Sequence, residues 1–127
     1  MKSKQEILEA LPNFYGTEAY HQWSPLFRNF VLTDGAKFIA DECGAYWLMD
    51  AIASHFHSYK DEEFVVAKLE DMGGTWSLDI EDGNDNGLAH QTIEFSDFPL
   101  DAITFYVVPQ EMETGRSLRV ILLTSEY

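Results

Sequence analysis

The spacing of apolar residues changes along this chain from a helical period to a period of two, and the change falls near Glu62. Between Asp34 and Tyr59, apolar side chains recur at intervals of three and four residues, which predicts an amphipathic helix with Thr33 or Asp34 as its N-cap. Gly44 lies within this stretch and can bend it or divide it into two helices. We expect this stretch to be the most buried helical part of the protein.

Beyond Glu62 the pattern is typical of strands. From Trp76 to Ile80, apolar residues alternate with polar and acidic ones, which predicts one buried face and one acidic face. The alternation resumes toward Ile93 after the turn-rich residues 82–87. If this loop joins a hairpin, the register places Asp79 opposite His90 on the exposed face.

Further segments complete the predicted fold. Residues 4–11 have the spacing of a helix that stops at Pro12, residues 64–69 favour a strand over a helix, and the apolar runs 103–108 and 118–123 predict a second hairpin. The predicted class is therefore α+β, with N-terminal helices packed on one face of a roughly five-stranded antiparallel sheet, a meander. A length of 127 residues fits a single domain spanning 1–127.

An aromatic-rich segment separates the predicted helices. Thr17 can cap a turn of helix that runs through Tyr20 and Trp23 before Pro25. We expect the six aromatic residues of this segment to pack around the core rather than to line a pocket; they are Phe14, Tyr15, Tyr20, Trp23, Phe27 and Phe30.

Acidic residues are concentrated in one third of the chain. Residues 61–101 hold twelve acidic residues and one basic residue, a net charge of −11 out of −14 for the whole chain. This concentration favours a basic partner and argues against direct binding of nucleic acid, because a polyanion repels a surface rich in carboxylates. The hydrophobic content of 46% and the aromatic content of 14% are those of a folded protein.

The compartment is predicted from the N-terminus and the cysteine content. The first residues are polar, and no stretch has the length and apolarity of a signal peptide or a membrane span. The single cysteine, Cys43, cannot form an internal disulfide. We therefore expect a cytoplasmic protein with no membrane partner.

Five short motifs together resemble a known family. They are Thr33-Asp34-Gly35, the stretch from Gly44 to Ile52, Asp82-Gly83-Asn84, the stretch from Ser96 to Leu100, and Ser125-Glu126-Tyr127. Their order and spacing resemble a small family from bacterial and mobile-element genomes that is classed only as a domain of unknown function, over roughly Phe14 to Tyr127. The resemblance implies a small accessory protein, and it carries no catalytic or binding residues to transfer.

The leading hypothesis is a non-enzymatic interaction protein. Asp79, Glu81 and Glu94 are predicted to form an outward row of negative charge, reinforced by Asp82 and Asp85 in the loop. This acidic sheet face would bind a basic protein surface, such as one that otherwise holds nucleic acid.

The alternative is a small hydrolase or ligand-binding domain. It would use Asp50, Cys43 and His55 in an aromatic-lined cleft beside Tyr46 and Trp47. The helical position of Cys43 favours a buried, inert thiol. For Asp50, a structural pairing with Arg28, Tyr20 or a backbone donor is favoured over a role as a polar anchor in a pocket.

No cofactor or metal is predicted. Residues 82–87 match the first half of a calcium loop, but its twelfth position is Ile93 instead of glutamate, so a plain turn is favoured. The histidines lack the spacing of a zinc site. A homodimer is a further possibility, with Leu118 to Thr124 as an edge strand that pairs across a two-fold axis.

Overall fold

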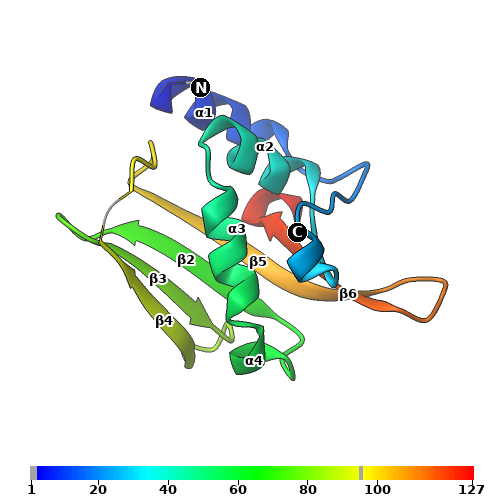
Figure 1. Ribbon diagram of the computed structural model, residues 1–127. Helices are drawn as coiled ribbons and strands as arrows, with labels where there is room; N and C mark the ends of the chain where they lie inside the picture. Colours follow the sequence, from blue (N-terminus) through cyan, green and yellow to red (C-terminus); the bar gives the residue numbers. More distant parts are fainter. Residues whose placement is uncertain (1–2, 95) are drawn as a thin grey trace.

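Helices cover one face of a six-stranded sheet in the computed structural model, which describes residues 3–94 and 96–127 (Figure 1). The predicted α+β class, with N-terminal helices on one face of the sheet, is confirmed. In chain order the elements are α1 Lys4–Ala10, η1 Leu11–Asn13, η2 Pro25–Phe27, β1 Phe30–Leu32, α2 Asp34–Glu42, α3 Tyr46–Ser54, α4 Phe56–Tyr59, β2 Val65–Asp71, β3 Trp76–Glu81, β4 Gly87–Ile93, β5 Ala102–Glu111, β6 Ser117–Leu123 and η3 Thr124–Glu126.

The strand order is β1-β6-β5-β2-β3-β4, so the predicted five-stranded antiparallel meander is wrong in strand number and in order. β2 lies between β3 and β5, and β1 adds a sixth strand that pairs in parallel with β6. The missed strand lies within the aromatic-rich segment and pairs Phe30–Leu32 with Arg119–Ile121. No turn signal marks such a pair, because its connection contains most of the chain.

The stretch predicted as one long helix is divided into α2, α3 and α4. Gly44 has a φ of +58°, the left-handed conformation that commonly follows the end of a helix, and α3 begins two residues later at Tyr46. Thr33 is the N-cap of α2, as predicted. Its hydroxyl accepts a hydrogen bond from the backbone N–H of Ala36 at 3.3 Å.

β3 and β4 pair in the predicted register, with Asp79 opposite His90. A register shift at the end of β3 puts Glu81 opposite Gly87, whereas the regular pattern predicted Leu88. β2 confirms the strand interpretation of its segment, and β5 and β6 form the predicted second hairpin.

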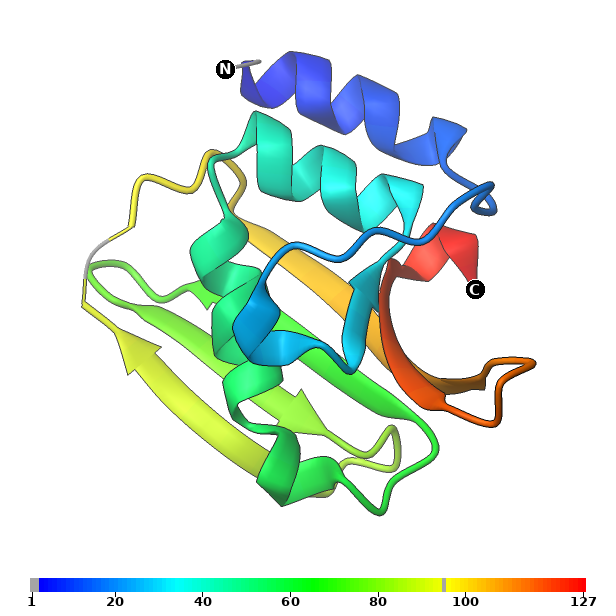
Figure 2. The same cartoon turned by 45° about the vertical axis from the view of Figure 1, so that its right-hand side comes forward.

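The two edges of the sheet differ. The outer edge of β1 is closed by His21, whose backbone N–H and C=O both bond to Leu32 at 2.8 Å. This extended segment stands where a helical turn after Thr17 was predicted, and that prediction is wrong. β4 forms the opposite edge and, within residues 3–94 and 96–127, pairs with β3 alone (Figure 2).

β6 is not an edge strand, so the premise of a dimer through Leu118 to Thr124 is wrong. β6 lies between β1 and β5, and its residues 119–121 pair on both sides. The physical reason is again the parallel pairing with β1, which covers the side of β6 that was expected to be open.

The main core lies between the helices and the sheet. Four of the six aromatic residues pack there as predicted, namely Phe14, Trp23, Phe27 and Phe30, whereas Tyr15 and Tyr20 are exposed to 85% and 44%. A smaller apolar cluster is formed by Val31, Leu118, Val120 and Leu122. Among the described residues, no helix has the length and apolar character needed to cross a membrane.

The C-terminal residues close the fold at the N-terminus of α2. Glu126 Oε1 accepts hydrogen bonds from the Thr33 hydroxyl at 2.6 Å and from the backbone N–H of Leu123 at 2.9 Å, and Oε2 accepts one from the backbone N–H of Gly35 at 3.0 Å. A Cβ atom on Gly35 would lie 2.6 Å from Glu126 Oε1, which explains the glycine. The first and last of the five sequence motifs therefore meet in space.

Candidate interaction surface

The β3–β4 hairpin presents the predicted pair of Asp79 and His90 on the face opposite the helices. Asp79 accepts hydrogen bonds from the Ser77 hydroxyl at 2.6 Å and from His90 Nδ1 at 2.7 Å. The Ser77 bond and then the His90 bond hold the pKa of Asp79 below its usual value, so this carboxylate stays charged at neutral pH. Lys68 of β2 lies opposite Asp79 in the register.

Three of the five predicted interaction residues line one cavity of about 470 Å³. Asp79 and Glu81 come from β3, and Asp85 comes from the loop between β3 and β4. Glu81 pairs with Lys68 at 3.3 Å. A single lysine and His90 thus face three carboxylates around this cavity, which leaves the site acidic.

The Asp82 carboxylate accepts hydrogen bonds from residues of its own loop. Its Oδ1 accepts hydrogen bonds from the backbone N–H groups of Asn84 at 2.8 Å and Asn86 at 3.2 Å, and its Oδ2 accepts one from the Asn86 side chain at 2.8 Å. The Asn86 side chain and the Asn84 backbone lower the pKa of Asp82. These bonds are those of an Asx turn. In the part of the chain that the structure describes, no group of three or more metal-ligating side chains is present.

Glu94 lies at the other end of β4 from the three clustered carboxylates. It lines a separate cavity of about 340 Å³ together with Asp71, Trp76 and Phe98. The acidic residues that were predicted to form one continuous row therefore form two separate groups. One group lies near the 82–87 loop, and the other lies around Glu94 and Asp71.

Two of the three arginines that could have neutralised this surface, Arg116 and Arg119, bind backbone carbonyls with their side chains. Arg119 donates to the carbonyls of Lys60 and Glu62, each at 2.7 Å, and Arg116 donates to the carbonyl of Arg28 at 2.7 Å. These two guanidinium groups are thus engaged away from the hairpin, and among the described residues Lys68 and His90 are the basic side chains that pair with its carboxylates.

An aromatic cluster that the sequence analysis did not identify lies next to this hairpin. The ring centroids of Phe64, Tyr106 and Tyr127 are 4.8 to 5.4 Å apart in tilted and edge-to-face contacts. Phe64 also lies against the loop, because a Cβ atom on Gly83 would come within 3.0 Å of its ring. The pairing of Val66 with Tyr106 between β2 and β5 brings the rings together, and the sequence carried no local signal for it.

The residues of the alternative site have separate partners. Asp50 is exposed and accepts a hydrogen bond from Trp23 Nε1 at 2.8 Å, a donor that was not among those considered. His55 bonds to the Gln91 side chain at 2.9 Å. The Tyr46 hydroxyl donates to Asp41, and Trp47 packs against the core.

Cys43 is buried in the core, 1% exposed. Burial, reinforced by the nearby charge of Glu42, raises the pKa of its thiol to about 11. A thiol with this pKa is protonated at neutral pH and is a poor nucleophile.

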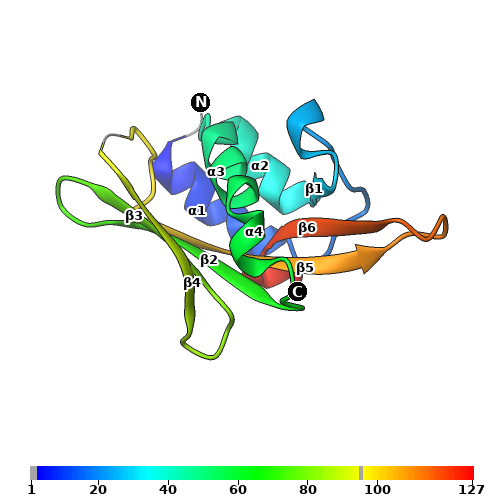
Figure 3. The same cartoon turned by 60° about the horizontal axis from the view of Figure 1, so that its bottom comes forward.

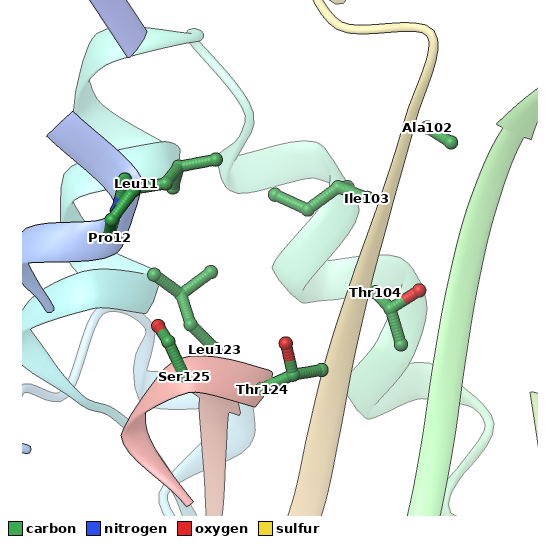
Figure 4. Close-up of a pocket in the computed structure, with 8 residues that line it drawn as sticks. All are labelled: Leu11, Pro12, Ala102, Ile103, Thr104, Leu123, Thr124 and Ser125. Atoms are coloured by element: carbon green, nitrogen blue, oxygen red, sulfur yellow. The ribbon is translucent and has the colours of Figure 1, made fainter. Parts of the chain in front are cut away.

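A separate cavity of about 550 Å³ lies between the N-terminal segment, the start of β5 and the end of β6 (Figure 4). Leu11, Ile103 and Leu123 point into it, and the hydroxyls of Thr124 and Ser125 lie along one side. None of its eight lining residues is charged. The cavity can accommodate an apolar group, but it offers no acid, base or nucleophile beyond these hydroxyls.

The chain belongs to a family of unknown function, DUF6876, whose family model matches residues 5–127. It matches no functionally curated protein and no solved structure. Membership confirms the resemblance to an uncharacterised domain family and extends it to the N-terminal helix.

Proposed function

We propose that this DUF6876 protein is a non-enzymatic interaction protein that binds a basic protein surface through its β3–β4 hairpin. One observation carries the proposal: Asp79, Glu81 and Asp85 line a single cavity on the hairpin, and Lys68 forms an ion pair with one of them, Glu81. An arginine or lysine side chain of a partner would complete the charge balance at this cavity. The proposal takes the protein to be a bacterial or mobile-element accessory protein of the cytoplasm.

The charge of the whole chain supports the same class of partner. With a net charge of −14, the protein attracts basic proteins over the range of the Debye length, about 10 Å at 0.1 M salt. The same field repels nucleic acid. A partner that itself binds nucleic acid would present the lysines and arginines that this surface needs.

The test measures binding of a fluorescent poly-L-lysine of about 20 residues, long enough to span the hairpin at about 3.3 Å per residue. A variant with Asp79→Asn, Glu81→Gln and Asp85→Asn removes the three charges and keeps the side-chain shapes. We expect at least about a tenfold loss of affinity in low salt, and weak binding of both proteins at about 0.5 M salt.

The matched control is Glu9→Gln, Glu111→Gln and Glu113→Gln, which changes the net charge by the same amount at exposed positions outside residues 61–101. Equal losses in the two variants would mean that only net charge matters, and the proposed surface would be wrong. Tight binding of a single-stranded DNA of similar length would also contradict the proposal.

A further inference from the structure

The outer edge of β4 has unpaired backbone. In the described ranges β4 pairs with β3 alone, and Figures 2 and 3 show no other segment running beside it. Alternate residues of a strand at an edge direct their N–H and C=O groups away from the sheet. The opposite edge of the sheet differs, because His21 bonds to Leu32 there.

Beyond the register shift next to Gly87, β4 lacks the devices that usually protect an edge strand. It has seven residues, with no proline and no lysine, and His90 is its one titratable residue. Gln91 bonds to His55 of the helical layer, so the strand is held in place from that side. Such a strand is a template for another extended chain.

The charges at its two ends decide which chain can pair with it. Glu81 and Asp85 lie near one end, and Glu94 and Asp71 lie near the other. A second copy of this protein, placed parallel or antiparallel, would bring carboxylates next to carboxylates at both ends. Self-pairing is therefore opposed, whereas a chain with basic residues at both ends is attracted.

We infer that β4 accepts an extended, basic segment of a partner protein as a seventh strand of the sheet. The seven residues of β4 span about 23 Å, which sets the separation of the basic residues in the partner at roughly seven positions. This inference rests on the proposed function and names the form in which the basic partner binds.

The test uses the full chain and three nine-residue peptides, each labelled for fluorescence anisotropy. The first peptide, KKVTVTVKK, has lysines at both ends and a strand-forming centre. The second, KKVPPTVKK, keeps the lysines but has two consecutive prolines, so that each edge of the peptide loses a backbone donor and neither edge can pair regularly with β4. The third, EEVTVTVEE, reverses the charges.

We expect KKVTVTVKK to bind at least about tenfold more tightly than KKVPPTVKK, and EEVTVTVEE not to bind. In the complex, hydrogen exchange at outward-facing amides of β4 should slow at least about tenfold. The amide of Leu32, which is already bonded to His21, should not change.

Equal affinity for the two lysine peptides would overturn strand addition and leave the proposed function standing, since charge alone would then explain binding. Slowed exchange at another strand but not at β4 would overturn it as well. A dimer formed through β4, detected by light scattering and by protection of the same amides without peptide, would contradict the argument from charge repulsion.

Discussion

Removal of the Glu126 side chain tests how the C-terminus stabilises this fold. The carboxylate accepts three hydrogen bonds, from the Thr33 hydroxyl and from the backbone N–H groups of Gly35 and Leu123. Gly35 is at the second position of α2, where the backbone N–H has no partner within the helix and the helix dipole favours a negative charge.

The magnitude follows from these contacts. A hydrogen bond to a charged group contributes about 1.5 to 3 kcal/mol, and the low end applies because Glu126 is only half-buried. Three bonds to one carboxylate are not independent, so we expect Glu126→Ala to lower the free energy of unfolding by about 3 kcal/mol. Thr33, which is 2% exposed, would lose its shortest bond.

Urea denaturation followed by tryptophan fluorescence measures this change. For a domain of this size, a loss of about 3 kcal/mol corresponds to a fall in Tm of about 10 °C. The control is Glu113→Ala, an exposed residue in the turn between β5 and β6, which should change stability by less than about 0.5 kcal/mol. If Glu126→Ala is as mild as this control, the closure of α2 by the C-terminus does not stabilise the protein.

Two further predictions concern titratable groups. The His21 side chain, and then the backbone N–H of Glu18, lower the pKa of Asp34 from its ordinary 3.8. The ionised form of Asp34 therefore stabilises the fold above pH 3.8, and this contribution is lost as the pH falls through the lower pKa of the folded state. In urea titrations below pH 3.8, the difference in stability between the wild type and Asp34→Asn should narrow, and a constant difference would contradict the assignment. The Cys43 thiol, with its pKa raised from 9.0 to about 11, should react with iodoacetamide at pH 8 at least about 100-fold more slowly in the native protein than in urea, and rapid native labelling would show that it is accessible as a thiolate.

The candidate surface was predictable from sequence only where it depends on local alternation. The period of two along β3 and β4 fixed the pairing of Asp79 with His90, because side chains alternate between the faces of a strand. Glu94 was placed wrongly in the same row as Asp79, and Asp82, which was expected to reinforce that row, instead bonds within its own loop. A side chain in a turn can bond to its own backbone, and Glu94 is a full strand length away from the loop.

The change of hydrophobic period determined the α+β class and the second hairpin, since each depends on residues close together in the chain. Tertiary structure alone decided the parallel pairing of β1 with β6, the binding of Glu126 to the start of α2, and the exposure of β4 as an edge. Each of these contacts joins segments far apart in sequence or depends on what lies beside them. Their energies arise from geometry that no local pattern of residues encodes.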